Sequence, residues 1–330
     1  MSEVRKDSLL EIKDLYVQYN TDDAVVHAVN GLSLSVNRGE SLGLVGETGA
    51  GKTTTALSIL KLLPAKIGEI TQGSIIYDGQ DLIKVSEKEM QKLRGEKISM
   101  IFQDPMTSLN PVLTVGSQIF EVLELHFPNM SVDEKNKRVE EILELVGIPA
   151  TRKDEYPHQF SGGMKQRIVI AMALVAEPEL LLADEPTTAL DVTIQVQILA
   201  LVRGLKEKFN TAMILITHDL GVVNEVCDHV AIIYGGEVIE IGTIEEVYGR
   251  TVNHPYTEGL FDSIPDLVSD ARRLKPIPGH MVDPTNLPEG CKFAERCSYC
   301  EAHCHVTEPQ PVCVGGTHWI RCYRFGEGQR

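Results

Sequence analysis

The segment GETGAGKT, residues 46–53, combines glycines, a lysine and a threonine at a spacing that suits phosphate binding. It fits the pattern G-x-x-x-x-G-K-[ST] and lies between an apolar strand pattern, LGLV, and a helical pattern, TTALSILKLL. Glycines let backbone N–H groups wrap a phosphate at a helix N-terminus, where the helix dipole favours anions. We expect Lys52 to neutralise the β- and γ-phosphates of a nucleotide and the Thr53 hydroxyl to bind Mg²⁺. A glycine-rich turn that only caps a helix is the alternative, which the flanking strand and helix disfavour.

A pair of carboxylates ends the apolar run LLLADE, residues 180–185. Beside a phosphate-binding loop, Asp184 suits a role in holding Mg²⁺, directly or through water. Glu185 is then placed to polarise the attacking water, because phosphoryl transfer needs positioning and charge neutralisation more than covalent help. A pair that is merely solvated at a strand end is the alternative.

Three further segments are weaker signals when each is taken alone. His218, in LITHD, follows an apolar run, where a single histidine is usually structural. Gln103, in MIFQDP, follows a short strand pattern, which is a common place for a polar residue. The turn SGGMKQ, residues 161–166, puts a serine and two glycines before the apolar helical run IVIAMALVA, and such a helix start attracts anions.

The elements that must position these residues indicate an α/β fold. Strand patterns occupy LLEIKDLYVQY, GLSLSV, ESLGLVG and GSIIYDGQDL, the last with a turn at Asp78 and Gly79. Residues 107–179 are mostly helical. The segment DEKNKRVEEILELVGI places apolar residues on one face of a helix, and Gly147 suits its C-cap. The buried-strand patterns LLLADE and AMILITHD return after it, separated by the helical TIQVQILALVRGLKEKF. We therefore expect an α/β core, a helical insertion at about 107–179, and a C-terminal appendage at 251–330.

Composition limits the classes of function. The 330 residues carry 31 basic and 47 acidic side chains, a net charge of −16, which argues against coating nucleic acid. The N-terminus has no apolar signal-peptide core, and no run of about 18 apolar residues occurs, so we expect an intracellular chain that does not itself span a membrane. Six of the seven cysteines lie in the last 40 residues, Cys227 being the other. In a reducing compartment such a group indicates a metal or redox site.

The order of these motifs resembles the ATP-binding-cassette (ABC) ATPases over residues 9–250. The resemblance implies an ABC-type P-loop NTPase with a RecA-like core and a helical subdomain. It also implies that Ser161, Gly162 and Gly163 contact the ATP bound by a second subunit, and that residues 188–191 form a D-loop at the dimer interface. Gln103 would be the Q-loop residue that senses Mg²⁺ and the attacking water, and His218 the switch histidine at the γ-phosphate.

Tyr19 would stack on adenine by the same resemblance, although it suits an ordinary strand aromatic equally well. The catalytic residues so implied are Glu185, His218 and Gln103. The Mg²⁺ ligands so implied are Thr53, Gln103 and Asp184. The nucleotide-binding residues so implied are Tyr19, Gly46, Glu47, Thr48, Gly49, Ala50, Gly51, Lys52, Thr53, Thr54, Gln103, Ser161, Gly162, Gly163, Gln166, Asp184 and Asp191.

The appendage, rich in cysteine and proline, narrows the resemblance. Its segments HPYTEGLFDSIP, RRLKPIPG and GCKFAERC resemble the C-terminal extension of oligopeptide and dipeptide importer ATPases, a group that includes nickel-importer relatives. The cysteines that match the family pattern are Cys291, Cys297, Cys304 and Cys322. Four thiolates suit Zn²⁺ or an iron–sulfur cluster, and spacings without C-x₂₋₄-C pairs favour [4Fe–4S] over Zn²⁺. Cys300 and Cys313 depart from the pattern and could compete as ligands; cysteines that only pack a small subdomain are a further alternative.

The resemblance implies an ATP-hydrolysing subunit of a membrane importer for di- or oligopeptides. Its expected partners are two transmembrane permease subunits, a second ATPase subunit (identical or paralogous) and, indirectly, an extracytoplasmic peptide-binding protein, with no nucleic acid. We expect it at the cytoplasmic face of the cell membrane. A soluble ABC ATPase of DNA repair or translation is the alternative, although such proteins usually carry a long coiled coil or a second cassette. A regulatory iron–sulfur protein is a third reading, which leaves the catalytic motifs unexplained.

Overall fold

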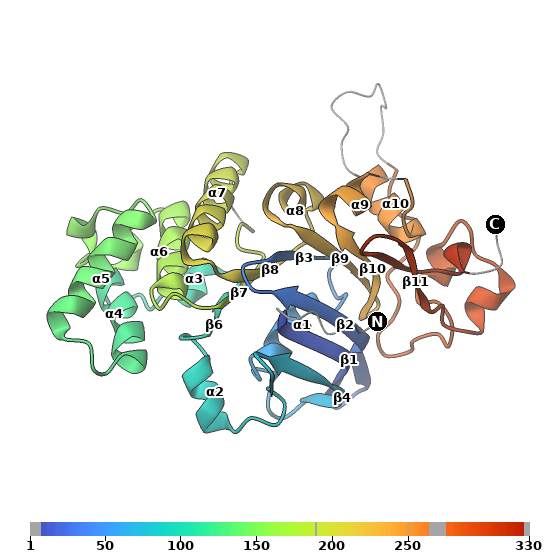
Figure 1. Ribbon diagram of the computed structural model, residues 1–330, viewed down its shortest axis with the longest axis horizontal. Helices are drawn as coiled ribbons and strands as arrows, with labels where there is room; N and C mark the ends of the chain where they lie inside the picture. Colours follow the sequence, from blue (N-terminus) through green and yellow to red (C-terminus); the bar gives the residue numbers. More distant parts are fainter. Residues whose placement is uncertain (1–7, 189, 250, 264–274, 327–330) are drawn as a thin grey trace. The chain divides into compact units, whose positions relative to one another are not determined.

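The chain divides into two compact units, each of which is built from separate stretches of sequence. The computed structural model describes residues 8–188, 190–249, 251–263 and 275–326 (Figure 1). The first unit comprises Met1–Leu9, Val36–Ser41 and Lys84–Ile216, and the second comprises Leu10–Ser35, Leu42–Ile83 and Thr217–Arg330. The second unit thus joins the C-terminal appendage to N-terminal strands, a division that differs from the predicted boundary near residue 250.

A parallel sheet forms the centre of the first unit. Its strands are β6 (Ile98–Ile101), β7 (Leu180–Asp184) and β8 (Ala212–Thr217), in the order β8-β7-β6. Every residue of β7 and β8 is buried, as expected for parallel strands covered on both faces. The helix α7 (Val192–Phe209) connects β7 to β8, and it begins at Asp191, whose side chain accepts a hydrogen bond from the Ile194 N–H. The predicted strands and the helix between them are confirmed.

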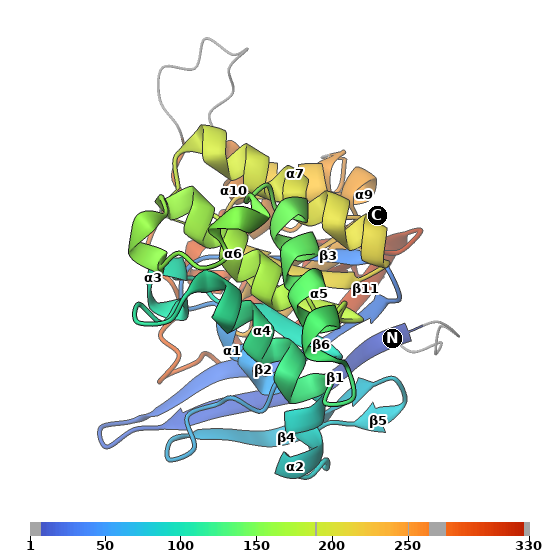
Figure 2. The same cartoon turned by 90° about the vertical axis from the view of Figure 1, so that its left-hand side faces the viewer.

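Helices make up most of the rest of the first unit, and Figure 2 shows α4, α5 and α6 close together. The helices are α2 (Glu87–Leu93), α3 (Pro105–Ser108), α4 (Val115–His126), α5 (Val132–Leu145) and α6 (Gly162–Leu174), with 3₁₀ turns at Ala150–Arg152 and Pro157–Gln159. Ser131 and Glu134 form a capping box at the start of α5. Gly147, with a φ of 77°, follows its end, as predicted. The helices place the turn before α6 at the surface.

An antiparallel sheet, ordered β2-β1-β4-β5, lies in the second unit. Its strands are β1 (Ser8–Asn20), β2 (Val25–Asn37), β4 (Gly68–Tyr77) and β5 (Gln80–Asp81). Asp78 and Gly79 both have positive φ, 46° and 80°, which gives the tight hairpin turn predicted between β4 and β5. β1 carries Tyr19 near its end.

A second group of strands in this unit, ordered β11-β12-β10-β9-β3, joins the appendage to the α/β core. The strands are β3 (Ser41–Val45), β9 (His229–Tyr234), β10 (Glu237–Thr243), β11 (Pro311–Gly315) and β12 (His318–Arg321). β3 and β9 are parallel, whereas β12 pairs antiparallel with β10 through Glu240–Ile320 and Ile241–Trp319. The sequence predicted little regular structure in the appendage, so its two strands, β11 and β12, are revealed only by the structure.

The helices of the second unit flank these strands. They are α1 (Lys52–Ile59), α8 (Leu220–Val226), α9 (Ile244–Tyr248) and α10 (Pro255–Asp262), with 3₁₀ turns at Ala294–Arg296, Ala302–His305 and Tyr323–Phe325. Tyr234, Tyr256 and Phe293 pack edge to face in one apolar core, with ring centroids 4.8–5.4 Å apart. The appendage therefore shares a core with strand β9. No helix within the described residues is both long and apolar enough to cross a membrane.

Candidate functional site

The phosphate loop, residues 46–54, connects β3 to the start of α1. Two of its glycines have no room for a side chain. A Cβ at Gly46 would lie 2.3 Å from the carbonyl oxygen of Ile233, and one at Gly51 would lie 2.3 Å from that of Ala28. Gly51 also has a φ of 97°, a backbone conformation that favours glycine. The glycines are thus required by the path of the loop as well as by the approach of a phosphate.

The lysine of this loop lies against the backbone of the same loop. Lys52 is buried, and its Nζ donates hydrogen bonds to the carbonyl oxygens of Gly46 at 2.6 Å and Glu47 at 3.0 Å. The Thr53 side chain is exposed, and the Thr54 hydroxyl lies 3.0 Å from the Tyr19 hydroxyl. The loop therefore places an ammonium group, an exposed threonine and a tyrosine around one helix start. A phosphate placed there would meet the ammonium and the first amides of α1.

Glu47 is held by residues that sequence reasoning missed. Its N–H donates to the Tyr256 hydroxyl at 3.0 Å, and its carboxylate accepts two hydrogen bonds from Arg296, at 2.9 and 3.1 Å. Arg296 lies 249 residues further along the chain, within the GCKFAERC segment. The sequence signal in that segment is its cysteines, and no local spacing indicates that its arginine reaches the phosphate loop.

The predicted catalytic carboxylate lies at the carboxyl end of the parallel sheet in the first unit. Asp184 is the buried last residue of β7, and Glu185 follows it. The Glu185 Oε2 accepts hydrogen bonds from Gln103 Nε2 at 2.9 Å and from the Thr188 hydroxyl at 2.8 Å. Gln103 follows β6, whose carboxyl end lies at the same edge of the sheet because β6 and β7 are parallel. The structure thus joins Gln103 to Glu185 as a polar pair.

Glu185 also has an unusual backbone. Its φ is 45°, and its N–H donates to the Ile216 carbonyl oxygen at 2.9 Å. A non-glycine residue in this left-handed region costs about 1–3 kcal/mol, and such strain is concentrated at functional sites. The neighbouring strand β8 therefore holds the carboxylate in a conformation that the residue alone disfavours.

The SGGMKQ turn begins helix α6. Ser161 is its N-cap, and the Ser161 hydroxyl accepts from the Met164 N–H at 3.4 Å. Ser161 and Gly162 are exposed, whereas a Cβ at Gly163 would lie 2.7 Å from Ile194 of α7. The buried amide of Gln166 has no hydrogen-bond partner within the described part of the chain. An exposed helix start that is fixed against α7 is a suitable shape for contact with an anion from another molecule.

The remaining predicted site residues are His218, which follows β8, and Asp191, which precedes α7. His218 and Asp219 are exposed between β8 and α8, and Asp219 caps α8 by accepting from the Gly221 N–H at 2.8 Å. Asp191 is exposed at the start of α7. Ala189, in the predicted D-loop, lies outside the described residues, as do 264–265 and 272–274 of the appendage motifs. The first unit groups Gln103 with Glu185, and the second groups Tyr19 with the phosphate loop.

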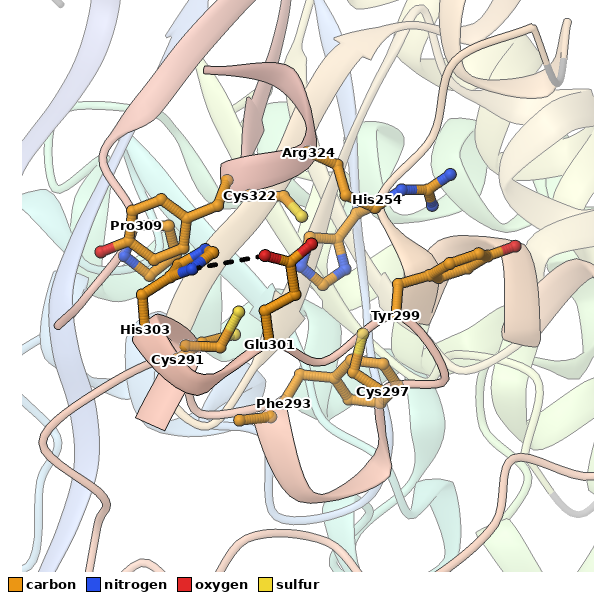
Figure 3. Close-up of a pocket in the computed structure, with 13 residues that line it drawn as sticks. His254, Cys291, Phe293, Cys297, Tyr299, Glu301, His303, Pro309, Cys322 and Arg324 are labelled. Carbon is orange, nitrogen blue, oxygen red and sulfur yellow. Dashed lines mark ion pairs between the residues drawn. The ribbon is translucent and has the colours of Figure 1, made fainter. Parts of the chain in front are cut away.

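Four cysteines of the appendage line a single small cavity. Figure 3 shows the side chains of Cys291, Cys297 and Cys322 around it, and Cys304 also lines it. These are the four that the sequence pattern selected. The Cys300 sulfur lies 3.2 Å from His305 Nε2, and Cys313 is exposed on β11. The four cysteines come from separate turns of the appendage and meet at this one cavity.

The thiols in this cavity are strongly affected by burial. Burial, together with the neighbouring Cys322, Cys304 and Cys297, raises the pKa of Cys291 to about 12. Burial likewise raises the pKa of Cys322 to about 11. These thiols therefore stay protonated at neutral pH unless a cation stabilises the thiolates. Within the described residues, no group of three or more His, Cys, Asp or Glu side chains is arranged to hold a single metal ion.

Comparisons with known proteins agree with this geometry. The family model for ABC transporters matches residues 29–188, and that for the oligopeptide/dipeptide transporter C-terminal region matches residues 239–304. The oligopeptide transport ATP-binding protein OppD of Bacillus subtilis is 49% identical over 97% of this chain and 90% of its own length. OppD of Haemophilus influenzae is 48% identical over 90% of this chain and 92% of its own length. The dipeptide transport ATP-binding protein DppD of Bacillus subtilis is 47% identical over 96% of this chain and 95% of its own length.

This chain belongs to the oligopeptide and dipeptide ABC transporter ATP-binding proteins. Among solved structures, the dimeric bacterial ABC transporter cassette MJ0796 is similar, with a TM-score of 0.64 and 28% identity over 71% of this chain and 98% of that chain. A dimeric post-hydrolysis state of the same cassette, bound to ADP and Pi, matches equally well. The predicted family and the ABC ATPase fold are confirmed. Members of this family of ATP-binding proteins hydrolyse ATP, so the predicted ATPase activity follows from membership.

Proposed function

We propose that this chain is the ATP-hydrolysing subunit that powers a membrane importer of di- or oligopeptides. The names of its relatives support peptides as the cargo. The observation that carries the catalytic part is Glu185, which follows a buried strand in a strained conformation and is hydrogen-bonded by Gln103 and Thr188. A carboxylate held in this way is preorganised to orient a water molecule.

Each group of residues has a role in hydrolysis under this proposal. Lys52 and the amides of the phosphate loop bind and orient the β- and γ-phosphates, and Tyr19 contacts the adenine. Thr53, Gln103 and Asp184 are the residues that would hold Mg²⁺. The ion supplies neutralisation of phosphate charge when it is bound.

The chemical step depends on a second set of residues. Glu185 accepts a proton from the attacking water, which Gln103 helps to place. His218 contacts the γ-phosphate. The exposed position of His218 and Gln103 in the described chain leaves both accessible to a nucleotide.

The SGGMKQ turn, whose first two residues are exposed, and the D-loop, residues 188–191, act in trans under this proposal. Ser161 and the first amides of α6 contact the nucleotide of a second ATPase subunit, so ATP closes a dimer and hydrolysis reopens it. The dimeric state of the similar cassette supports this arrangement. Two permeases in the membrane receive the motion at its cytoplasmic face, and an extracytoplasmic binding protein delivers the peptide.

The four-cysteine cavity is proposed to hold a [4Fe–4S] cluster, with Zn²⁺ as the alternative. Such a cluster is held by four cysteine thiolates, and each of them binds a different iron. The cavity supports this proposal because it brings the four predicted cysteines, and not Cys300 or Cys313, around one space. The cluster would supply a covalent anchor for a segment that has little core of its own.

The test of the transport proposal is the set of proteins that accompany the chain in native membranes. We expect two permeases and one further ATPase subunit to co-purify with the tagged chain after mild detergent extraction. Uptake of labelled peptides by the cells should stop when Lys52→Ala replaces the wild type, because that variant lacks the ammonium in the phosphate loop. Co-purification with repair enzymes or ribosomes instead, with peptide uptake intact, would support the soluble ABC ATPase alternative.

A further inference from the structure

The phosphate loop carries an acidic residue, which is unfavourable for its task. Glu47 is the second residue of GETGAGKT and is half-buried. A carboxylate so close to bound phosphates repels them, because like charges in a partly buried site are weakly screened. The loop therefore needs a cation for Glu47 besides Lys52, whose ammonium serves the phosphates.

Arg296 of the appendage supplies this cation. Its guanidinium donates two parallel hydrogen bonds to the Glu47 carboxylate, from Nη1 at 2.9 Å and from Nη2 at 3.1 Å. Bidentate pairs of this kind fix direction as well as charge. The Tyr256 hydroxyl accepts from the Glu47 N–H, so a second residue from the C-terminal part holds the same loop residue.

The guanidinium is itself fixed by its surroundings. The Arg296 side chain is only 6% exposed, and its Nε donates to the Pro278 carbonyl oxygen at 2.9 Å. It lies 5.7 Å from the ring centroid of Tyr234 and 5.9 Å from that of Phe293. The aromatic core shared by β9 and the appendage thus holds the cation that faces Glu47.

The tip of the loop also meets the appendage. Met281 lies beside Gly49, because a Cβ built at this glycine would lie 3.9 Å from the Met281 sulfur. Met281 and Arg296 come from one stretch of the appendage, joined by the Arg296–Pro278 hydrogen bond. The appendage therefore holds Glu47 through Tyr256 and Arg296, and it lies beside the loop again at Gly49.

We infer that Arg296 is a positioning residue of the nucleotide site, which neutralises Glu47 and, with Tyr256, holds the phosphate loop in its phosphate-binding curve. The inference rests on the proposed role of the loop in ATP binding. It gives the appendage a function at the nucleotide, in addition to any metal that its cysteines bind. The affinity for ATP is then coupled to the state of a segment almost 250 residues away in sequence.

The test is a double-mutant cycle on the affinity for Mg-ATP, measured by calorimetry with the full-length chain. We expect Arg296→Met to weaken binding about tenfold, within the usual range of coupling between sites, because it leaves Glu47 unpaired beside the phosphates. In a Glu47→Gln background the same change should weaken binding less than about twofold, because the repelling charge is absent. Arg296→Lys, which keeps the charge and loses the fork, should lie between wild type and Arg296→Met.

Two comparisons keep the result interpretable. Lys275→Ala removes an exposed cation of the appendage that pairs with Asp262, and it should leave the affinity unchanged. Arg296→Met could fail to fold, which thermal unfolding would show. In that case the affinities of Arg296→Lys in both backgrounds and of Tyr256→Phe test the inference. Tyr256→Phe removes only the hydroxyl that accepts from the Glu47 N–H. Those variants should weaken binding with Glu47 present.

Equal losses for the Arg296 variants with and without the Glu47 charge would overturn the inference, and so would unchanged affinity in every Arg296 and Tyr256 variant. A wild-type chain that does not bind Mg-ATP would instead contradict the proposed function. The two failures are therefore distinguishable by the wild-type measurement.

Discussion

At the scale of single residues, two glutamates share the left-handed backbone conformation but have different partners. Glu185 and Glu177 both have positive φ, 45° and 53°. Glu177 pairs with Arg138 at the surface of the helical region, whereas Glu185 accepts from Gln103 and Thr188 at the sheet edge. The same strain therefore accompanies a surface ion pair in one case and a preorganised carboxylate in the other, and the partners distinguish the two.

Replacement of Glu185 tests the proposed chemistry. Glu185→Gln keeps the size of the side chain and an oxygen that accepts from Gln103, but it removes the base. We expect Mg-ATP binding to persist while turnover falls by at least about a hundredfold, the effect of a lost general base. ATP-bound dimers should accumulate, because closure precedes cleavage, and size-exclusion chromatography with ATP measures them.

Glu177→Gln is the matched control for that experiment. It makes the same chemical change at a glutamate with the same backbone conformation, and its turnover should match that of the wild type. Near-normal hydrolysis by Glu185→Gln would show that another group serves as the base.

The residues of the motifs were predictable because their signals are local. The segment GETGAGKT contains its glycines, lysine and threonine within eight positions. In the structure, Lys52 donates a hydrogen bond to the Gly46 carbonyl oxygen of the same loop. Arg296 has no such local signal, since its partner Glu47 lies 249 residues earlier and ion pairs of this range follow from the fold alone. The capping by Ser161 lies between these cases, because an N-cap is a local feature and a contact in trans is not.

At the scale of elements, helix α6 separates roles within one subunit from roles between subunits. Ser161→Arg puts a large cation at the exposed start of α6. We expect it to abolish hydrolysis by the dimer, since the turn must approach the neighbour's nucleotide, while one-subunit ATP binding stays nearly intact. Equilibrium dialysis of ATP at low protein concentration, beside a turnover assay at high concentration, measures the two effects.

Lys52→Ala provides the contrast to Ser161→Arg. It removes the ammonium from the chain's own phosphate loop, so binding to the single subunit should weaken. If both variants lose single-subunit binding to the same extent, the turn does not act in trans.

Elements of the α/β core were predicted more fully than those of the appendage. β7 and α5 have continuous apolar or one-faced patterns, and their bounds follow those patterns closely. β12 is four residues long, and it pairs with β10 from far along the chain, so its pattern is too short to be read. Helix α10 could have been predicted from a local signal, since a proline, Pro255, occupies its first turn directly after the capping residue His254.

At the scale of the whole molecule, the cysteine cavity is the feature whose content can be measured most directly. Anaerobically purified protein should be brown, absorb broadly near 400 nm in the manner of thiolate-bound clusters, and contain about four irons per chain. Serine at any of Cys291, Cys297, Cys304 or Cys322 should bleach the protein and loosen the appendage, because metal binding and folding are coupled in such segments. Optical absorption, iron analysis and limited proteolysis measure these effects.

Cysteines outside the cavity are the controls for that prediction. Cys227→Ser and Cys313→Ser should leave colour and iron content unchanged, since Cys227 packs against the apolar core and Cys313 is exposed on β11. Colourless anaerobic protein with one tightly bound zinc per chain would establish Zn²⁺ in place of the cluster.

The bond between Glu47 and Arg296 also orders events during biosynthesis. A ribosome adds about 5–20 residues per second, so the 249 residues between them take about 12 to 50 s to make. For that time the phosphate loop has emerged without its cation from the appendage, and we expect it to hold ATP weakly. An unfinished or prematurely terminated chain would then engage neither nucleotide nor partner subunit firmly. An anchor that lies 249 residues after the loop therefore ties ATP-dependent assembly to synthesis of the appendage.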